Sequence, residues 1–218
     1  MESIQDLNRE NITIDEGSMT KILNWAYDSA LNGIPGLGTA EDLAKDFLKE
    51  GLPYEKCVDK LIHWQDAKCA TSGFITGLGG FITLPVAIPV NLASVIYVQI
   101  RMIAAIAYMG GYDIRDDRVR TLVYVCLVGN SGVEAIKDVG IQVGTKAAKN
   151  FIKNKVSAET LKKINQKVGF RLVTKFGEKG VINLGKCVPI VGGVIGAILD
   201  GVATQAIGKT AKKTFTPA

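Results

Sequence analysis

One histidine and two carboxylates share a helical face at a spacing that suits a metal ion or acid–base chemistry. His63 follows Asp59 by four positions and precedes Asp66 by three, so all three side chains fall on one side of a helix. Imidazole and carboxylate groups are common metal ligands and general acids or bases. The chain contains no second histidine, however, and a solvated helical face explains the pattern better. We therefore expect neither a metal nor a cofactor.

A second group of carboxylates, Asp113, Asp116 and Asp117, could bind a cation, but its sequence context favours a turn and a helix start. Acidic side chains at such a position interact favourably with the helix dipole and its free N–H groups. A single histidine supports no Ser–His–Asp arrangement, and no nucleophile elbow is present. We therefore expect no catalytic residues, and we favour a non-enzymatic protein.

The cysteines and the N-terminus indicate a reducing, cytoplasmic setting. Cys57, Cys69, Cys126 and Cys187 form no Cys-x-x-Cys pair, and each has apolar neighbours, which predicts buried, reduced thiols. The first ten residues are polar and acidic and lack the basic and apolar regions of a secretory signal. We expect the chain to start in the cytosol.

The segment 73–89, GFITGLGGFITLPVAIP, is rich in glycine but does not match a phosphate-binding loop. Its glycines fit neither Gly-x-Gly-x-x-Gly nor Gly-x-x-x-x-Gly-Lys-Ser/Thr, and no strand is expected before it. Gly73 and Gly77 are four residues apart, a spacing that lets two helices approach closely. The same spacing recurs at 140/144 and 192/196. These glycines favour tight helix packing, in a buried setting or one compatible with lipid.

The 32 residues from Cys69 to Ile100 carry no charge, which is more than the roughly 20 needed for a helix to span a bilayer. Pro85 and Pro89 divide this run because proline removes a backbone donor and disfavours helix at the preceding residue. We expect one helix ending near Leu84, a short connection, and a second helix from about 90 to 108. The sequence thus predicts an apolar, glycine-rich helical hairpin.

Four polar side chains form one stripe, about 100° wide, on the second helix of this hairpin, and they must face protein or water. They are Asn91, Ser94, Arg101 and Tyr108. An unpaired ion in an apolar setting would cost several kcal/mol. We expect Arg101 and Asp200, the lone charge in the second apolar zone, to pair with each other or with other partners such as Glu134 or Asp113.

Apolar residues recur at three and four positions along nearly the whole chain, which predicts an all-α protein. Residues 1–16 read as a polar arm, and 17–218 as a single helical domain. A first helix should end at 33–36, Thr39 should cap the second, and Pro53 should be the first residue (N1) of the third. Later helices are expected from a cap at Asp116, over 131–153, and over 158–176 after Ser157. The fold expected is a multi-helix bundle built around the hairpin.

Charge is distributed unevenly along the chain, although the net charge is only +5. Residues 1–68 carry 13 acidic and 7 basic side chains, whereas residues 137–213 carry 4 and 15. The basic third is rich in lysine but poor in arginine and aromatic residues, so no nucleic-acid partner is expected. Anionic lipid suits these lysines better. A solvated lysine face, or contact with the acidic N-terminal third, remains an alternative.

Several sequence blocks in combination resemble the EcsC family of bacteria. They are the run 70–80, ATSGFITGLGG, the two prolines after it, the helix 101–107, RMIAAIA, and Gly111-Tyr112-Asp113. The ending over 188–196 and 206–213 is also similar to domains attached to bacterial membrane GTPases. The family motif corresponds here to Gly77, Gly79, Gly80, Pro85, Pro89, Gly111, Tyr112 and Asp113. The resemblance implies a helical domain, named for an operon that also encodes an ABC exporter affecting secretion, but it supplies no catalytic residues.

These patterns favour a protein that docks on the cytoplasmic face of the inner membrane, accessory to a transporter, a secretion system or another membrane protein. The expected membrane-contact residues are Phe74, Ile75, Leu78, Phe81 and Leu84, and the expected head-group ligands are Lys209, Lys212 and Lys213. One alternative is a soluble helical domain that binds a lipid or another apolar small molecule in its core, with an enzymatic role open to it. A further alternative is a membrane-acting effector or immunity protein in bacterial conflict.

Overall fold

The computed structural model describes residues 15–49, 51–69, 90–129, 147–153, 156–177 and 193–217. Over these residues the chain forms helices and no named strand, which confirms the all-α prediction. The segment 70–89, and with it the glycine-rich half of the expected hairpin, lies outside the described residues. The described helices are α1 (Glu16–Asn32), α2 (Ala40–Leu48), α3 (Tyr54–Cys69), α5 (Val90–Met109), α6 (Asp117–Val128), α8 (Ala147–Lys153), α9 (Ala158–Gly177) and α11 (Gly193–Thr214).

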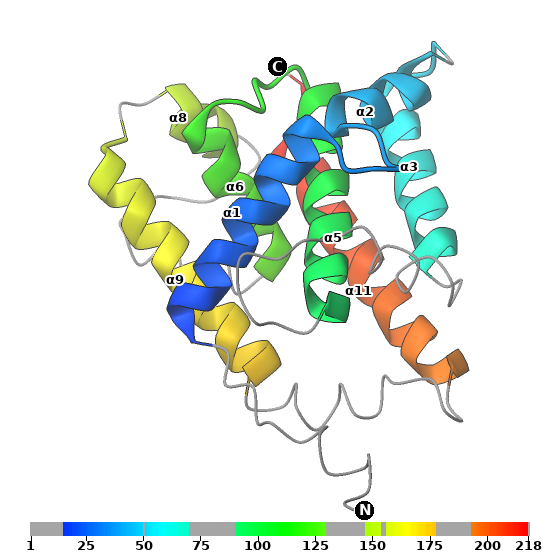
Figure 1. Cartoon of the computed structure of the whole chain (residues 1–218). Coiled ribbons are helices and arrows are strands. Elements are labelled where there is room, and N and C mark those ends of the chain that lie inside the picture. The colour runs from blue at the N-terminus through cyan, green and yellow to red at the C-terminus, as the bar shows by residue number, and fades with distance from the viewer. Residues whose placement is uncertain are drawn as a thin grey trace, which may run out of the picture.

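Helix α5 occupies the centre of the bundle, and α1, α2, α3, α6 and α11 pack around it (Figure 1). It is the one described helix long and apolar enough to cross a membrane, but 89% of the window Leu92–Met109 is buried inside the protein. Such a helix is buried all round, as the core helix of a globular protein is. The part of the uncharged run that lies in α5 therefore belongs to the core of this fold.

Local capping signals set the starts of the early helices. The Asp15 side chain accepts a hydrogen bond from the backbone N–H of Ser18 at the start of α1. Thr39 caps α2 in a reciprocal capping box with Asp42, as its sequence predicts. The prediction for Pro53 was wrong by one residue, because α3 begins at Tyr54. The Pro53 carbonyl accepts the first helical hydrogen bonds of α3, from Lys56 and Cys57.

The later helices match the predicted ones where the structure describes them. Asp116 is the N-cap of α6, and its carboxylate accepts from the backbone N–H of Arg118. The Ser157 hydroxyl accepts from the N–H of Thr160 at the start of α9. Of the helix expected over 131–153, the described part is α8, since 130–146 lies outside the described residues. From Gly193 onward, the apolar residues and the C-terminal lysines share one continuous helix of 22 residues, α11.

The packing of α3 with α11 and of α9 with α1 and α6 determines which helix ends lie together. Helix α11 runs antiparallel to α3, because Asp59 pairs with Lys212 while Asp66 pairs with Gln205. Helix α9 packs against α1 and α6 on the other side of the molecule. As a result the C-terminal ends of α3 and α9 and the N-terminal ends of α5 and α11 lie at one end of the bundle, the lower end in Figure 1.

Candidate functional site

The lower end of the bundle is where the chain leaves and re-enters the described helices on either side of two segments, 70–89 and 178–192. Residues 70–89 connect the end of α3 to the start of α5, and residues 178–192 connect the end of α9 to the start of α11. All four helix ends lie at this end of the molecule (Figure 1). The five expected membrane-contact residues and the family-motif residues Gly77, Gly79, Gly80, Pro85 and Pro89 fall in the first segment, outside the described residues.

Arg101 is buried, with 7% of its surface exposed, and backbone carbonyls are its hydrogen-bond partners. Its Nε donates to the carbonyl oxygen of Gly38 at 2.8 Å, and its Nη2 lies 3.5 Å from the carbonyl oxygen of Thr39. Burial lowers the pKa of the guanidinium, and the neighbouring Tyr97 and Asp42 oppose that shift. Arg101 therefore holds the loop before α2 against α5.

The acidic partners considered for Arg101 lie elsewhere or outside the described part of the chain. Asp113 accepts a hydrogen bond from the backbone N–H of Arg115. Glu134 and the side chain of Asp200 are among the parts that the structure does not describe. The pairing of Arg101 with Asp200 therefore stays a prediction, although Arg101 has carbonyl partners without it.

The polar stripe of α5 faces protein where its side chains are described. Ser94 is fully buried, and the Tyr108 hydroxyl donates to Glu41 Oε1 on α2 at 3.2 Å. The side chain of Asn91 lies outside the described part. One turn from Arg101, the buried Tyr97 packs its ring against Trp25 of α1, with centroids 6.0 Å apart. These contacts tie α5 to α1 and α2.

The three C-terminal lysines lie away from the lower end of the bundle. Lys212 Nζ is 2.6 Å from Asp59 Oδ1, and the Tyr54 hydroxyl donates to the Lys212 carbonyl. Lys209 and Lys213 are exposed on the same part of α11. Asp59 precedes the last residue of α3 by ten positions, which is about 15 Å along a helix. The structure therefore does not bring Lys212 together with the helix ends that flank segment 70–89.

The face of α3 that carries His63 packs against α11. No group of potential metal ligands occurs among the described residues. Asp59 pairs with Lys212, and Asp66 accepts a hydrogen bond from Gln205 Nε2 at 2.7 Å. His63 itself is exposed. Sequence reasoning missed this role of the two aspartates, because their partners on α11 are about 140 to 150 residues away in the chain.

The motif Gly111-Tyr112-Asp113 fixes the C-terminal end of the chain to the end of α5. Gly111 has φ of 81°, the left-handed region that favours glycine, and this conformation ends the helix. The Tyr112 hydroxyl donates to the Thr216 carbonyl, and its ring packs on the buried Phe215. A Cβ at Gly110 would lie 2.0 Å from the Phe215 carbonyl oxygen. The described contacts of this motif are structural.

The described thiols are buried in the core. Cys57 and Cys126 are free and buried, as their apolar neighbours predicted. Burial raises the pKa of the Cys126 thiol to about 12, so this thiol stays protonated at neutral pH. The described residues also include no group of side chains that could hold a metal ion. The polar side chains discussed above instead link one helix to another.

These features define a class of protein: over the described residues it is all-α, with a buried apolar helix at its centre. A fold of this kind does not by itself indicate a reaction. Residues 23–217 match the EcsC protein family, and the chain belongs to this family. No curated protein and no solved structure matches the chain.

Proposed function

We propose that this EcsC family protein docks on the cytoplasmic face of the bacterial inner membrane and acts there without catalysis, as an accessory of a transporter or another membrane protein. The observation that carries the proposal is the position of the helix ends around segment 70–89. The last residue of α3 and the first of α5 lie at the lower end of the bundle, where α11 also begins. The uncharged, apolar segment 70–89 thus starts and ends on one side of the molecule.

The burial of α5 supports peripheral docking over insertion of that helix. The apolar surface of Leu92–Met109 is already used in the core, so inserting α5 would require unpacking the bundle. The apolar residues of 70–89 are the part of the uncharged run that α5 does not include. Contiguous exposed apolar patches mark lipid or protein contacts, and we assign that role to this segment. The proposed contacts are Phe74, Ile75, Leu78, Phe81 and Leu84.

Co-sedimentation with liposomes of varied anionic content tests the proposal. We expect the full-length protein to pellet with anionic vesicles, and high salt to weaken this binding without abolishing it. Phe81→Asp together with Leu84→Asp should weaken partitioning by at least about tenfold, because two apolar side chains are replaced by charges. The matched control is Leu48→Asp with Asn32→Asp, which adds two carboxylates at exposed positions of α2 and α1.

Two results would overturn this function. Wild-type protein that pellets with no vesicle composition would return the segment to the interior of a soluble bundle, and the search would move to an apolar ligand. Pelleting that is equal for wild type and the Phe81/Leu84 variant would show that this segment is not the anchor. Circular dichroism of each variant would confirm that its helices are retained.

A further inference from the structure

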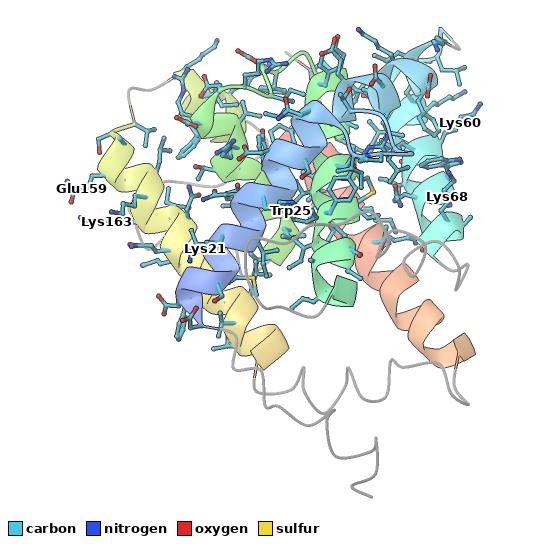
Figure 2. The ribbon with its side chains drawn as sticks, viewed as in Figure 1. Lys21, Trp25, Lys60, Lys68, Glu159 and Lys163 are labelled. Atoms are coloured by element: carbon cyan, nitrogen blue, oxygen red, sulfur yellow. The ribbon has the colours of Figure 1, made fainter. Side chains whose placement is uncertain are left out.

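The outer face of α9 carries basic side chains beside a large apolar one. The inner face of this helix buries Ile164, Val168 and Leu172 in the core. On the outer face Lys162 and Lys163 are exposed, and Phe170 exposes 52% of its surface. Figure 2 shows Lys163 and Glu159 directed outward from α9, on the opposite side of the molecule from Lys60 and Lys68 of α3. An exposed phenylalanine beside lysines is typical of a surface that meets a lipid interface.

Charge on α8 and α9 is strongly one-sided. The two helices together contain seven basic residues and one acidic residue, Glu159. Glu159 pairs with Lys163 at 2.8 Å, but the two side chains are 75% and 62% exposed. An exposed pair of this kind contributes little and exchanges readily with other partners. By sequence α8 and α9 therefore carry a strong net positive charge.

We propose that the outer face of α9, defined by Lys162, Lys163 and Phe170, lies along an anionic phospholipid bilayer. This inference rests on the proposed function and assigns its head-group contacts to α9 instead of the C-terminal lysines. Lysines near an anionic surface are attracted to it, while a phenylalanine partitions into the interface. A bilayer fits better than nucleic acid, because α9 carries one arginine and, among its described side chains, one exposed aromatic.

The position of these lysines along α9 determines how the molecule must lie on the bilayer if they are to reach it. Gly169 lies beside Thr20 near the start of α1, so α9 descends toward the lower end of the bundle. Lys163 precedes the last residue of α9 by fourteen positions, which is about 20 Å along the helix. This exceeds the Debye length of about 8 Å at physiological salt. A molecule standing on its lower end alone would hold Lys162 and Lys163 too far from lipid to matter.

A triple substitution on α9 and a matched triple on α2 test this orientation. The α9 variant is Lys162→Gln, Lys163→Gln and Phe170→Ser. The control, Lys45→Gln, Lys49→Gln and Leu48→Ser, removes the same charge and an exposed apolar side chain from α2. In co-sedimentation with anionic vesicles we expect the α9 variant to bind at least about thirtyfold more weakly than wild type, and the control to bind within about threefold.

The outcomes separate this inference from the proposed function. If wild type pellets and the α9 variant pellets equally well, the α9 face is not a lipid contact, while membrane docking stands. If wild type pellets with no vesicle, both fail. A third outcome is that wild type pellets with no vesicle but binds a labelled single-stranded RNA, and that the α9 variant does not bind this RNA. The ligand of the α9 face would then be nucleic acid and not lipid.

Tryptophan emission gives a second readout that does not depend on affinity. Phe170→Trp should shift its emission to shorter wavelength when anionic vesicles are added, because the indole leaves water. Leu48→Trp, at the other exposed apolar position, should show no such shift. Equal behaviour of the two variants on vesicles that bind the protein would overturn the proposed orientation.

Discussion

At the scale of single residues, Asp42 shows how one carboxylate can hold a helix start. Its Oδ2 accepts from the Thr39 backbone N–H at 2.9 Å and from the Thr39 hydroxyl at 2.8 Å. The side-chain hydrogen bond and then the backbone one hold the pKa of Asp42 below its ordinary value of 3.8. A lowered folded-state pKa contributes stability that is present above the unfolded-state pKa and is lost as pH falls through the folded-state pKa.

We therefore predict that Asp42→Asn lowers the urea midpoint at pH 7 and that its difference from wild type shrinks as pH falls below about 4. Urea unfolding followed by circular dichroism from pH 7 down to pH 2 would measure this. Asp46→Asn on the same helix is the control, since the Asp46 carboxylate contacts the exposed Lys49. A difference between Asp42→Asn and wild type that stays constant with pH would contradict the assignment.

Arg101 marks what the sequence cannot reveal at this scale. Its sequence position predicts burial, because it directly follows a run of 32 uncharged residues and lies on an apolar helix. Opposite charges are visible in a sequence, so reasoning from it considers carboxylates as partners. Backbone carbonyls occur at every residue and carry no sequence signal, yet Gly38 and Thr39 supply them here. Burial was predictable, whereas the partner depends on where the loop before α2 lies.

At the scale of elements, the close approach of α3 and α11 depends on Gly208. A Cβ at this position would lie 2.6 Å from Ile62 Cγ1 and 2.8 Å from its Cδ1. We predict that Gly208→Ala lowers the free energy of unfolding by about 1 to 3 kcal/mol, because extra atoms in a packed interface force helices or side chains to shift.

A double-mutant cycle with Ile62→Ala identifies the cause of that loss. Ile62→Ala alone should destabilise by creating a cavity, and Gly208→Ala should refill part of it. The double variant should then be more stable than the two single losses predict, by about 1 kcal/mol or more in urea unfolding. Additive losses would mean that Gly208 does not meet Ile62.

The helices themselves were predictable because their signals are local. Apolar spacing, the Thr39 capping box and the Asp116 cap each act within a few residues, and each predicted its helix correctly. The pairing of α3 with α11 joins residues more than 130 positions apart, and no periodicity encodes it. Gly208 illustrates this difference, because it belongs to none of the four-residue glycine spacings in the sequence, and its contact with Ile62 appears only in the fold.

At the scale of the whole molecule, the uncharged run from Cys69 to Ile100 begins at the last residue of α3 and ends within the central helix α5. Its second part enters α5, where most side chains are buried by five neighbouring helices. Hydropathy alone does not separate a core helix from a membrane segment, because both remove apolar side chains from water. The docking proposed above therefore uses the basic face of α9 and segment 70–89 and leaves α5 in place.

This division predicts how the protein behaves when it binds vesicles. If docking is peripheral, α5 stays packed, and its backbone amides should exchange with deuterium as slowly on anionic vesicles as in solution. Insertion of α5 would instead expose the faces of α1 and α6 that pack against it, and their amides would exchange faster. Zwitterionic vesicles at the same lipid concentration provide the unbound control. Faster exchange in α1 and α6 on anionic vesicles alone would show that the core opens to reach the membrane, whereas unchanged exchange means that docking uses only the surface of an intact bundle.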